Sequence, residues 1–236
     1  MNTHLESLKA MEKRILVGIE TGNVPGRLGA AVVEVSGYGD ETVLDLHGFR
    51  SYPIPSELQS TIEALEGEEN FDSEEIAGIN FLVLQHLFKL FQEVCEQVGT
   101  PPDRIDLVGL KQLEIGGKSF PSDPSVLSEL TGCTLVTCFS IGVENGEGGF
   151  LPVKEPVLQG MVEAMMDRFG LDSEVREAVA VALLANESLF HESSEMCETT
   201  GGVDGPKGGR LRSMKSTGAS TSAGKAILCG EFFFPA

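Results

Sequence analysis

Residues 14–36, RILVGIETGNVPGRLGAAVVEVS, contain two short apolar runs rich in β-branched residues, at 15–19 and 28–35. Gly22, Pro25 and Gly26 lie between these runs, so the pattern predicts a β-hairpin. The turn has two interpretations. Its backbone N–H groups can form a nest that holds a phosphate, or its residues can be ordinary turn formers.

The composition is that of a globular protein. The chain has 236 residues, of which 41% are hydrophobic, and this is enough for one large domain or two small ones. No apolar run approaches the roughly 20 residues that span a bilayer. The charged N-terminal segment lacks the apolar stretch of a signal peptide, so we expect a cytoplasmic protein with no membrane partner.

Charge and metal-ligating residues exclude two further classes. The formal net charge of −19 repels a nucleic-acid backbone, and the few basic residues within 200–225 do not reverse this. The five cysteines follow no zinc spacing and the four histidines stand far apart in the sequence. We therefore expect no nucleic-acid partner, reduced structural thiols and no metal site built from these residues.

The order of the remaining elements indicates a fold class. A third strand follows the hairpin, and then come helices, the longer of which has apolar residues every three or four positions. The next apolar run is short and continuous, as in a central parallel strand, and a short helix and a fifth strand follow. In chain order, the expected ranges are 42–49, 56–66, 72–98, 105–110, 125–130 and 134–139. This is the ribonuclease-H-like order of actin-like ATPases and sugar kinases, an α/β fold with a mixed five-stranded sheet.

The C-terminal part is less regular. A glycine-rich loop at 145–152 leads to helices near 157–169 and 173–190, and a last strand is expected at 226–235. The Gly, Ser and Thr residues of 199–225 predict a surface loop or a disordered insertion. We divide the chain into an N-terminal extension (1–13), a ribonuclease-H-like lobe (14–170) and a C-terminal part with a helix, the 199–225 loop and the final strand (171–236).

Local motifs stand in a consistent order along the chain. The main ones are Gly18-Ile-Glu-Thr-Gly-Asn-Val-Pro-Gly26, Val108-Gly109 followed by Lys111-Gln112, and Gly146-Glu-Gly-Gly-Phe-Leu151. Shorter ones are found at 52–58, 177–185 and 217–236. In this order they resemble the glycine turn, the glutamine after a strand and the glycine loop of the anhydro-N-acetylmuramic acid kinase family, whose relatives include levoglucosan kinase.

The resemblance implies phosphorylation of a 1,6-anhydro sugar with ATP and Mg²⁺ as cofactors. A carboxylate would activate the water that opens the anhydro bridge, and the freed O6 would accept the γ-phosphoryl group. By position, the implied nucleotide-binding residues are Gly18, Thr21, Gly22 and Asn23. The implied sugar-binding residues are Gln112, Gly146, Glu147 and Gly148, and Glu144 stands nearest to the place of the general base.

The departures from the family pattern fall on the chemistry. Gly26-Arg27 replaces the Asp-Gly of the family's turn, and an arginine can neutralise phosphate but cannot coordinate magnesium. Residues 138–142, CFSIG, replace the arginine-rich segment that carries the family's base, and Glu144 lies three residues later than an ungapped alignment requires. We therefore expect an impaired or inactive anhydro-sugar kinase.

The family's second lobe, with its further glycine motifs, has no counterpart in this sequence, so we expect a fold whose second lobe is largely missing. Three alternatives stay open: an active kinase that rebuilds a two-sided cleft as a homodimer, a non-catalytic pseudokinase that binds a sugar or a larger paralogue, and a truncated product with no role. The expected partners are thus a small-molecule sugar and either a second copy or a paralogue.

Overall fold

The computed structural model describes a large part of the chain. The described residues are 3–21, 27–65, 73–111, 114–115, 118–119, 123–145, 149–152, 166–167, 169–190, 210–221 and 224–233. None of the helices in these ranges is both long and apolar enough to cross a bilayer.

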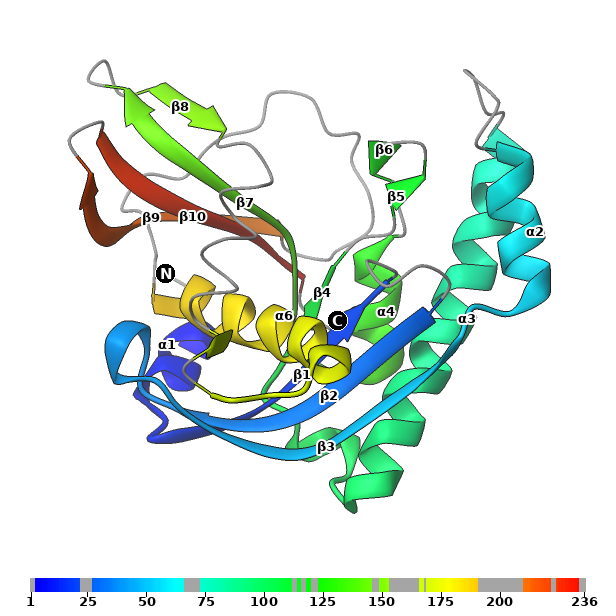
Figure 1. Cartoon of the computed structure of the whole chain (residues 1–236), viewed down its shortest axis with the longest axis horizontal. Coiled ribbons are helices and arrows are strands. Elements are labelled where there is room, and N and C mark those ends of the chain that lie inside the picture. The colour runs from blue at the N-terminus through cyan, green and yellow to red at the C-terminus, as the bar shows by residue number, and fades with distance from the viewer. Residues whose placement is uncertain are drawn as a thin grey trace.

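A mixed five-stranded sheet forms the centre of the molecule (Figure 1). Its strands are β1 (Lys13–Glu20), β2 (Arg27–Ser36), β3 (Val43–Pro53), β4 (Leu107–Leu110) and β7 (Leu135–Asn145). They lie side by side in the order β3-β2-β1-β4-β7, with β2 antiparallel to both β1 and β3, and β4 parallel to both β1 and β7. The predicted ribonuclease-H-like sheet is therefore confirmed, including the buried parallel strand β4.

The sheet continues beyond β7 in a way that the sequence analysis did not anticipate. Strand β7 runs to Asn145 rather than ending near 139, and it pairs with both β8 (Gly149–Pro152) and β10 (Gly224–Phe233). Strand β9 (Arg210–Thr221) then pairs antiparallel with β10. Residues 210–221, which we expected in a loop, are thus a strand, because Ser and Thr are compatible with a pleated backbone and the ladder with β10 satisfies their amide groups.

Helices cover both faces of the sheet. The elements are α1 (Thr3–Ala10), α2 (Ser56–Leu65), α3 (Ser73–Val98), α4 (Pro124–Thr131) and α6 (Ser173–Phe190), with short 3₁₀ turns η1 (Gly39–Glu41) and η2 (Pro102–Arg104) and a small hairpin of β5 (Glu114–Ile115) and β6 (Lys118–Ser119). One apolar cluster lies between the sheet and α3 and α4, and a second lies between the sheet and α1 and α6. Most of the helix expected near 157–169 lies outside the described residues.

The N-terminal segment is part of this second cluster. Leu5 and Leu8 of α1 are each only 4% exposed and pack with residues of α6 and β2. Segment 1–13, which we described as an extension, therefore contributes side chains to the core of the lobe.

A buried arginine fastens the C-terminal end of α6 to the sheet. Arg14 is 1% exposed, and its guanidinium donates to Asn186 Oδ1 (2.9 Å), Gly37 O (2.9 Å) and Met11 O (2.7 Å) while it lies 4.8 Å from the ring centre of Phe190. Burial lowers the pKa of this guanidinium, although the nearby carboxylates partly counteract the effect. Because each of the three guanidinium nitrogen atoms donates at least one hydrogen bond, the charge stabilises the junction instead of opposing folding.

Candidate functional site: the carboxyl ends of β1 and β4

The carboxyl ends of β1 and β4 lie side by side. Ile19 is in register with Leu110, and the N–H of Lys111 donates to the Ile19 carbonyl at 2.9 Å. In open α/β sheets, ligands bind in the crevice outside the carboxyl ends of parallel strands. We refer to Glu20, Thr21 and Lys111, which stand at these strand ends, as the carboxyl edge.

Thr21 fixes the start of the predicted phosphate turn. Its side chain is nearly buried, at 6% exposure, and its Oγ1 donates to the carbonyl of Lys111 at 2.8 Å. This bond ties the chain that leaves β1 to the chain that leaves β4. Of the other predicted residues of this turn, Gly22 and Asn23 lie outside the described residues.

Gly18 lies inside β1, and its main contact is with helix α6. It pairs with Gly109 of β4, and a Cβ atom built on Gly18 would overlap Ala178 O and lie 2.6 Å from Ala182 N. A Cβ on Gly109 would lie 2.5 Å from Val181 O. The two glycines therefore form a flat area on which the backbone of α6 rests, and a nucleotide-binding role for Gly18 stays a prediction.

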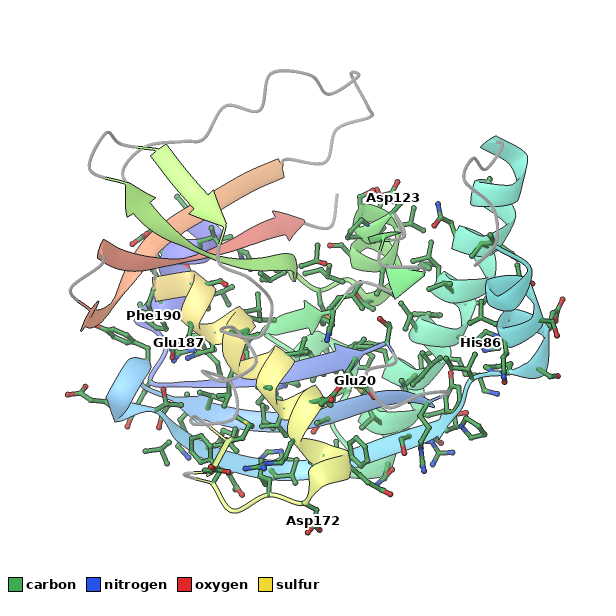
Figure 2. The ribbon with its side chains drawn as sticks, turned by 45° about the horizontal axis from the view of Figure 1, so that its top comes forward. Glu20, His86, Asp123, Asp172, Glu187 and Phe190 are labelled. Atoms are coloured by element: carbon green, nitrogen blue, oxygen red, sulfur yellow. The ribbon has the colours of Figure 1, made fainter. Side chains whose placement is uncertain are left out.

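Glu20 is a residue of this edge that the sequence reasoning left out. It is only 3% exposed, and its Oε1 would lie 3.0 Å from a Cβ atom on Gly29. Figure 2 shows Glu20 beside α6, close to the end of β1. The sequence signal was an acid that directly follows the apolar run 15–19 and precedes the Thr21-Gly22 pair, and we assigned it no role in the sequence analysis.

The carboxyl edge has one carboxylate, that of Glu20, which could contribute to a magnesium site. A carboxylate beside a phosphate-binding turn repels a bare phosphate, but it suits a magnesium ion that takes one or two carboxylates together with phosphate oxygens. Within the described ranges no group of three or more His, Cys, Asp or Glu residues could hold a metal ion. A metal at this edge would therefore depend on Glu20 and on oxygens supplied by a ligand.

Arg27 provides a positive charge at the other side of the turn. It begins β2, its Nη2 donates to Ser51 Oγ at 2.7 Å, and its Nη1 lies 4.0 Å from Glu174 Oε1 at the start of α6. The guanidinium is 41% exposed. It is thus held near the turn and remains accessible to an anionic ligand.

Glu144 lies far from this edge. Strand β7 is last paired with β4 at Val136, and Glu144 is eight residues further along, where it pairs with Phe150 of β8. At about 3.3 Å per residue, that is about 26 Å along the strand. Figure 1 shows this part of β7 extending away from the end of β1. The Glu144 side chain, Gln112, and the loop residues Gly146, Glu147 and Gly148 lie outside the described residues.

Comparison with known proteins agrees with this architecture. The chain is 26% identical over 170 aligned residues to an anhydro-N-acetylmuramic acid kinase of Caldanaerobacter subterraneus subsp. tengcongensis, with 62% of this chain and 41% of that protein covered. It is 24% identical over 135 residues to the enzyme of the same name from Bacillus thuringiensis subsp. konkukian, with 52% and 35% covered. No family model matches the chain.

The strand order and the helices on both faces of the sheet define an α/β lobe of the ribonuclease-H-like class. The aligned part of the chain spans less than half the length of the curated relatives it matches. The chain is a distant homologue of the anhydro-N-acetylmuramic acid kinases, as the sequence motifs had indicated.

Proposed function

We propose that this chain is an anhydro-sugar kinase lobe that binds MgATP or an anhydro sugar at its carboxyl edge but does not itself transfer the phosphoryl group. The observation that carries the proposal is the separation between Glu144 and the turn after β1. Homology to kinases supports the binding half of the proposal, and the position of Glu144 supports the catalytic half.

The reaction requires the general base to lie close to the sugar. A general base must lie within hydrogen-bond reach of the water that it activates, or reach it through one further water. Opening of the anhydro bridge and phosphorylation of the freed oxygen both take place on one sugar ring. Thr21 is bonded to Lys111, two residues beyond Gly109, so the Glu144 backbone lies about six residues, or about 20 Å of strand, beyond this level. A base there is out of reach of a sugar whose oxygen contacts a phosphate at Thr21. Residues 138–142 contain no carboxylate that could replace it.

The groups that remain at the carboxyl edge are suited to binding. Thr21 positions the turn, Arg27 can neutralise a phosphate and Glu20 can hold a magnesium ion together with phosphate oxygens. Magnesium would supply charge neutralisation of the phosphates at this edge. A larger paralogue of the chain is the alternative ligand of this surface.

The test combines binding with product detection on the purified full chain. Thermal shift measures binding of MgATP, of levoglucosan and of anhydro-N-acetylmuramic acid, since a ligand at 100 times its Kd adds about 2.7 kcal/mol to the free energy of unfolding. Phosphorus NMR of the same mixtures detects a sugar phosphate. We expect a shift with at least one ligand and no sugar phosphate.

The Glu144→Gln variant is the matched control. We expect it to be indistinguishable from the wild type in both measurements. Formation of a sugar phosphate that the Glu144→Gln substitution abolishes would refute the catalytic half of the proposal. The absence of a thermal shift with every ligand would refute the binding half, and a paralogue would then become the occupant to test.

A further inference from the structure

Strand β3 is a long, open edge of the sheet. It has 11 residues, none of them fully buried, and within the described part of the chain it pairs with β2 alone. Val43, at its beginning, is 64% exposed. Such an edge presents a row of backbone N–H and C=O groups to any further strand that can match it.

A bulge in β3 changes which residues share a face. Val32 is paired with Gly48 and Val33 with Leu46, so His47 is an extra residue on β3. Leu46 and Phe49 both pack toward the cluster beneath α6, although they are three positions apart.

On the opposite face of β3, too, the extra residue brings together side chains that a regular strand would place on different faces. Arg50 Nε donates to Glu93 Oε2 of α3 at 2.6 Å, so Arg50 lies on the α3 side. Asp45 precedes Leu46 and therefore lies on the same side as Arg50, because successive residues of a strand alternate. Asp45 and Arg50 thus share one face, and Leu46 and Phe49 share the other.

We propose that β3 pairs antiparallel with β3 of a second copy of this chain, about a twofold axis between His47 and Gly48. A twofold axis perpendicular to a sheet keeps each face on its own side, so paired residues must lie on the same face in the monomer. This register places Asp45 of one copy opposite Arg50 of the other and Leu46 opposite Phe49, each pair occurring twice. The bulge allows this register, because without it Asp45 and Arg50 would lie on opposite faces.

Charge favours this occupant and this register. The Asp45 side chain is 78% exposed, with His47 Nε2 3.9 Å from its carboxylate, and the Arg50 side chain is 46% exposed beside Glu93, so both can be reached by a second chain. A shift of two residues in either direction would place Asp45 opposite Gly48 or Tyr52 and leave its charge without a cross-strand partner. Opposite charges directly across an antiparallel pair stabilise it, and like charges destabilise it.

Light scattering after size exclusion, and sedimentation over a concentration series, test the proposal on the full chain. We expect a dimer for the wild type and, for Asp45→Arg, a Kd weaker by about thirty-fold, because two like-charged pairs replace two favourable ones. The double variant Asp45→Arg/Arg50→Asp should restore dimerisation. Glu129→Arg, on an exposed position of α4, is the control for the change in net charge.

The control Glu129→Arg also distinguishes the effect of the local charge at position 45 on dimer affinity from the effect of the net charge. Asp45→Arg and Glu129→Arg each reduce the net negative charge of −19 by the same amount, so general electrostatics predicts stronger association for both variants. We expect stronger or unchanged association only for Glu129→Arg. Circular dichroism melts show whether the double variant Asp45→Arg/Arg50→Asp, which also loses the contact between Arg50 and Glu93, is still folded.

Cross-linking gives a second readout that does not depend on affinity. The variant Asp45→Cys/Arg50→Cys should form an intermolecular disulfide on mild oxidation, whereas Asp45→Cys/Tyr52→Cys should not exceed the wild-type background. A wild type that stays monomeric at its highest soluble concentration would overturn the proposal, and the charges on β3 would then act to keep the edge unpaired. A dimer that is unaffected by Asp45→Arg and does not cross-link would also overturn it.

Discussion

The substitution Gly18→Ala tests whether the sheet beneath α6 is as flat as the structure indicates. The added Cβ would overlap Ala178 O and lie 2.6 Å from Ala182 N, and both are backbone atoms that cannot rotate away. To relieve the overlap with Ala178 O, α6 must move back by more than about 1 Å, which separates it from the apolar cluster that it shares with the sheet. Overpacking costs about 1–3 kcal/mol, and a backbone clash belongs at the upper end.

For a chain of this size, about 3 kcal/mol lowers the melting temperature by about 6–12 °C. Differential scanning calorimetry of the two proteins measures this shift. The matched control is Gly78→Ala, at an exposed position of α3 where a Cβ meets nothing within 4 Å. There the same change should stabilise by about 0.5–1 kcal/mol, because alanine is the better helix former. A Gly18→Ala protein that melts like the wild type, but no longer responds to MgATP, would refute the packing role and favour the nucleotide-binding one.

Three further predictions concern buried polar groups. Arg14→Met should lower the free energy of unfolding by about 3–5 kcal/mol in urea titrations, because it leaves the buried acceptors around the guanidinium without donors. Arg14→Lys should not restore the stability, because a lysine cannot reproduce the planar set of donors. A loss below about 1 kcal/mol for Arg14→Met would contradict this. Thr21→Val should cost about 1 kcal/mol by removing the bond to the Lys111 carbonyl, while Thr21→Ser should keep it, and equal losses in both variants would show that the methyl group matters instead. Burial raises the pKa of the Cys95 thiol from 9.0 to about 12 and that of the Cys133 thiol to about 11. As the pH rises, these thiols therefore ionise in the unfolded chain before they ionise in the folded one. The free energy of unfolding should fall above pH 9 by up to about 1.4 kcal/mol per pH unit for each thiol. Alanine at either position should flatten that slope in alkaline unfolding curves, and an unchanged slope would assign it to other groups.

The central sheet could be predicted because its signals are local. The β-rich runs around the glycine turn, the apolar repeat of α3 and the continuous run of β4 each lie within one short segment. Their order along the chain was then enough to indicate the ribonuclease-H-like class with a mixed five-stranded sheet.

The parts that could not be predicted depend on distant partners. Strand β9 has only two large apolar residues in RLRSMKSTGAST, and it becomes a strand because β10 offers a ladder. Arg14 directly precedes an apolar run, and its burial has no local signal, because it depends on Asn186 and Phe190, which are more than 170 residues away in the sequence. The close contact between Gly18 and the backbone of α6 could not be predicted either, because Ala178 and Ala182 are distant in the sequence.

The contact between Gly18 and α6 also has a consequence for synthesis on the ribosome. Ala178 is translated about 160 residues after Gly18, which at about 5–20 residues per second means a delay of about 8–30 s. During that interval the nascent sheet lacks the cover that α6 provides beside α1, and the apolar surface that α6 will bury is available to chaperones or to other nascent chains. Slowing of elongation in the last third of the message should therefore reduce the yield of native protein more than slowing of the same extent near its start.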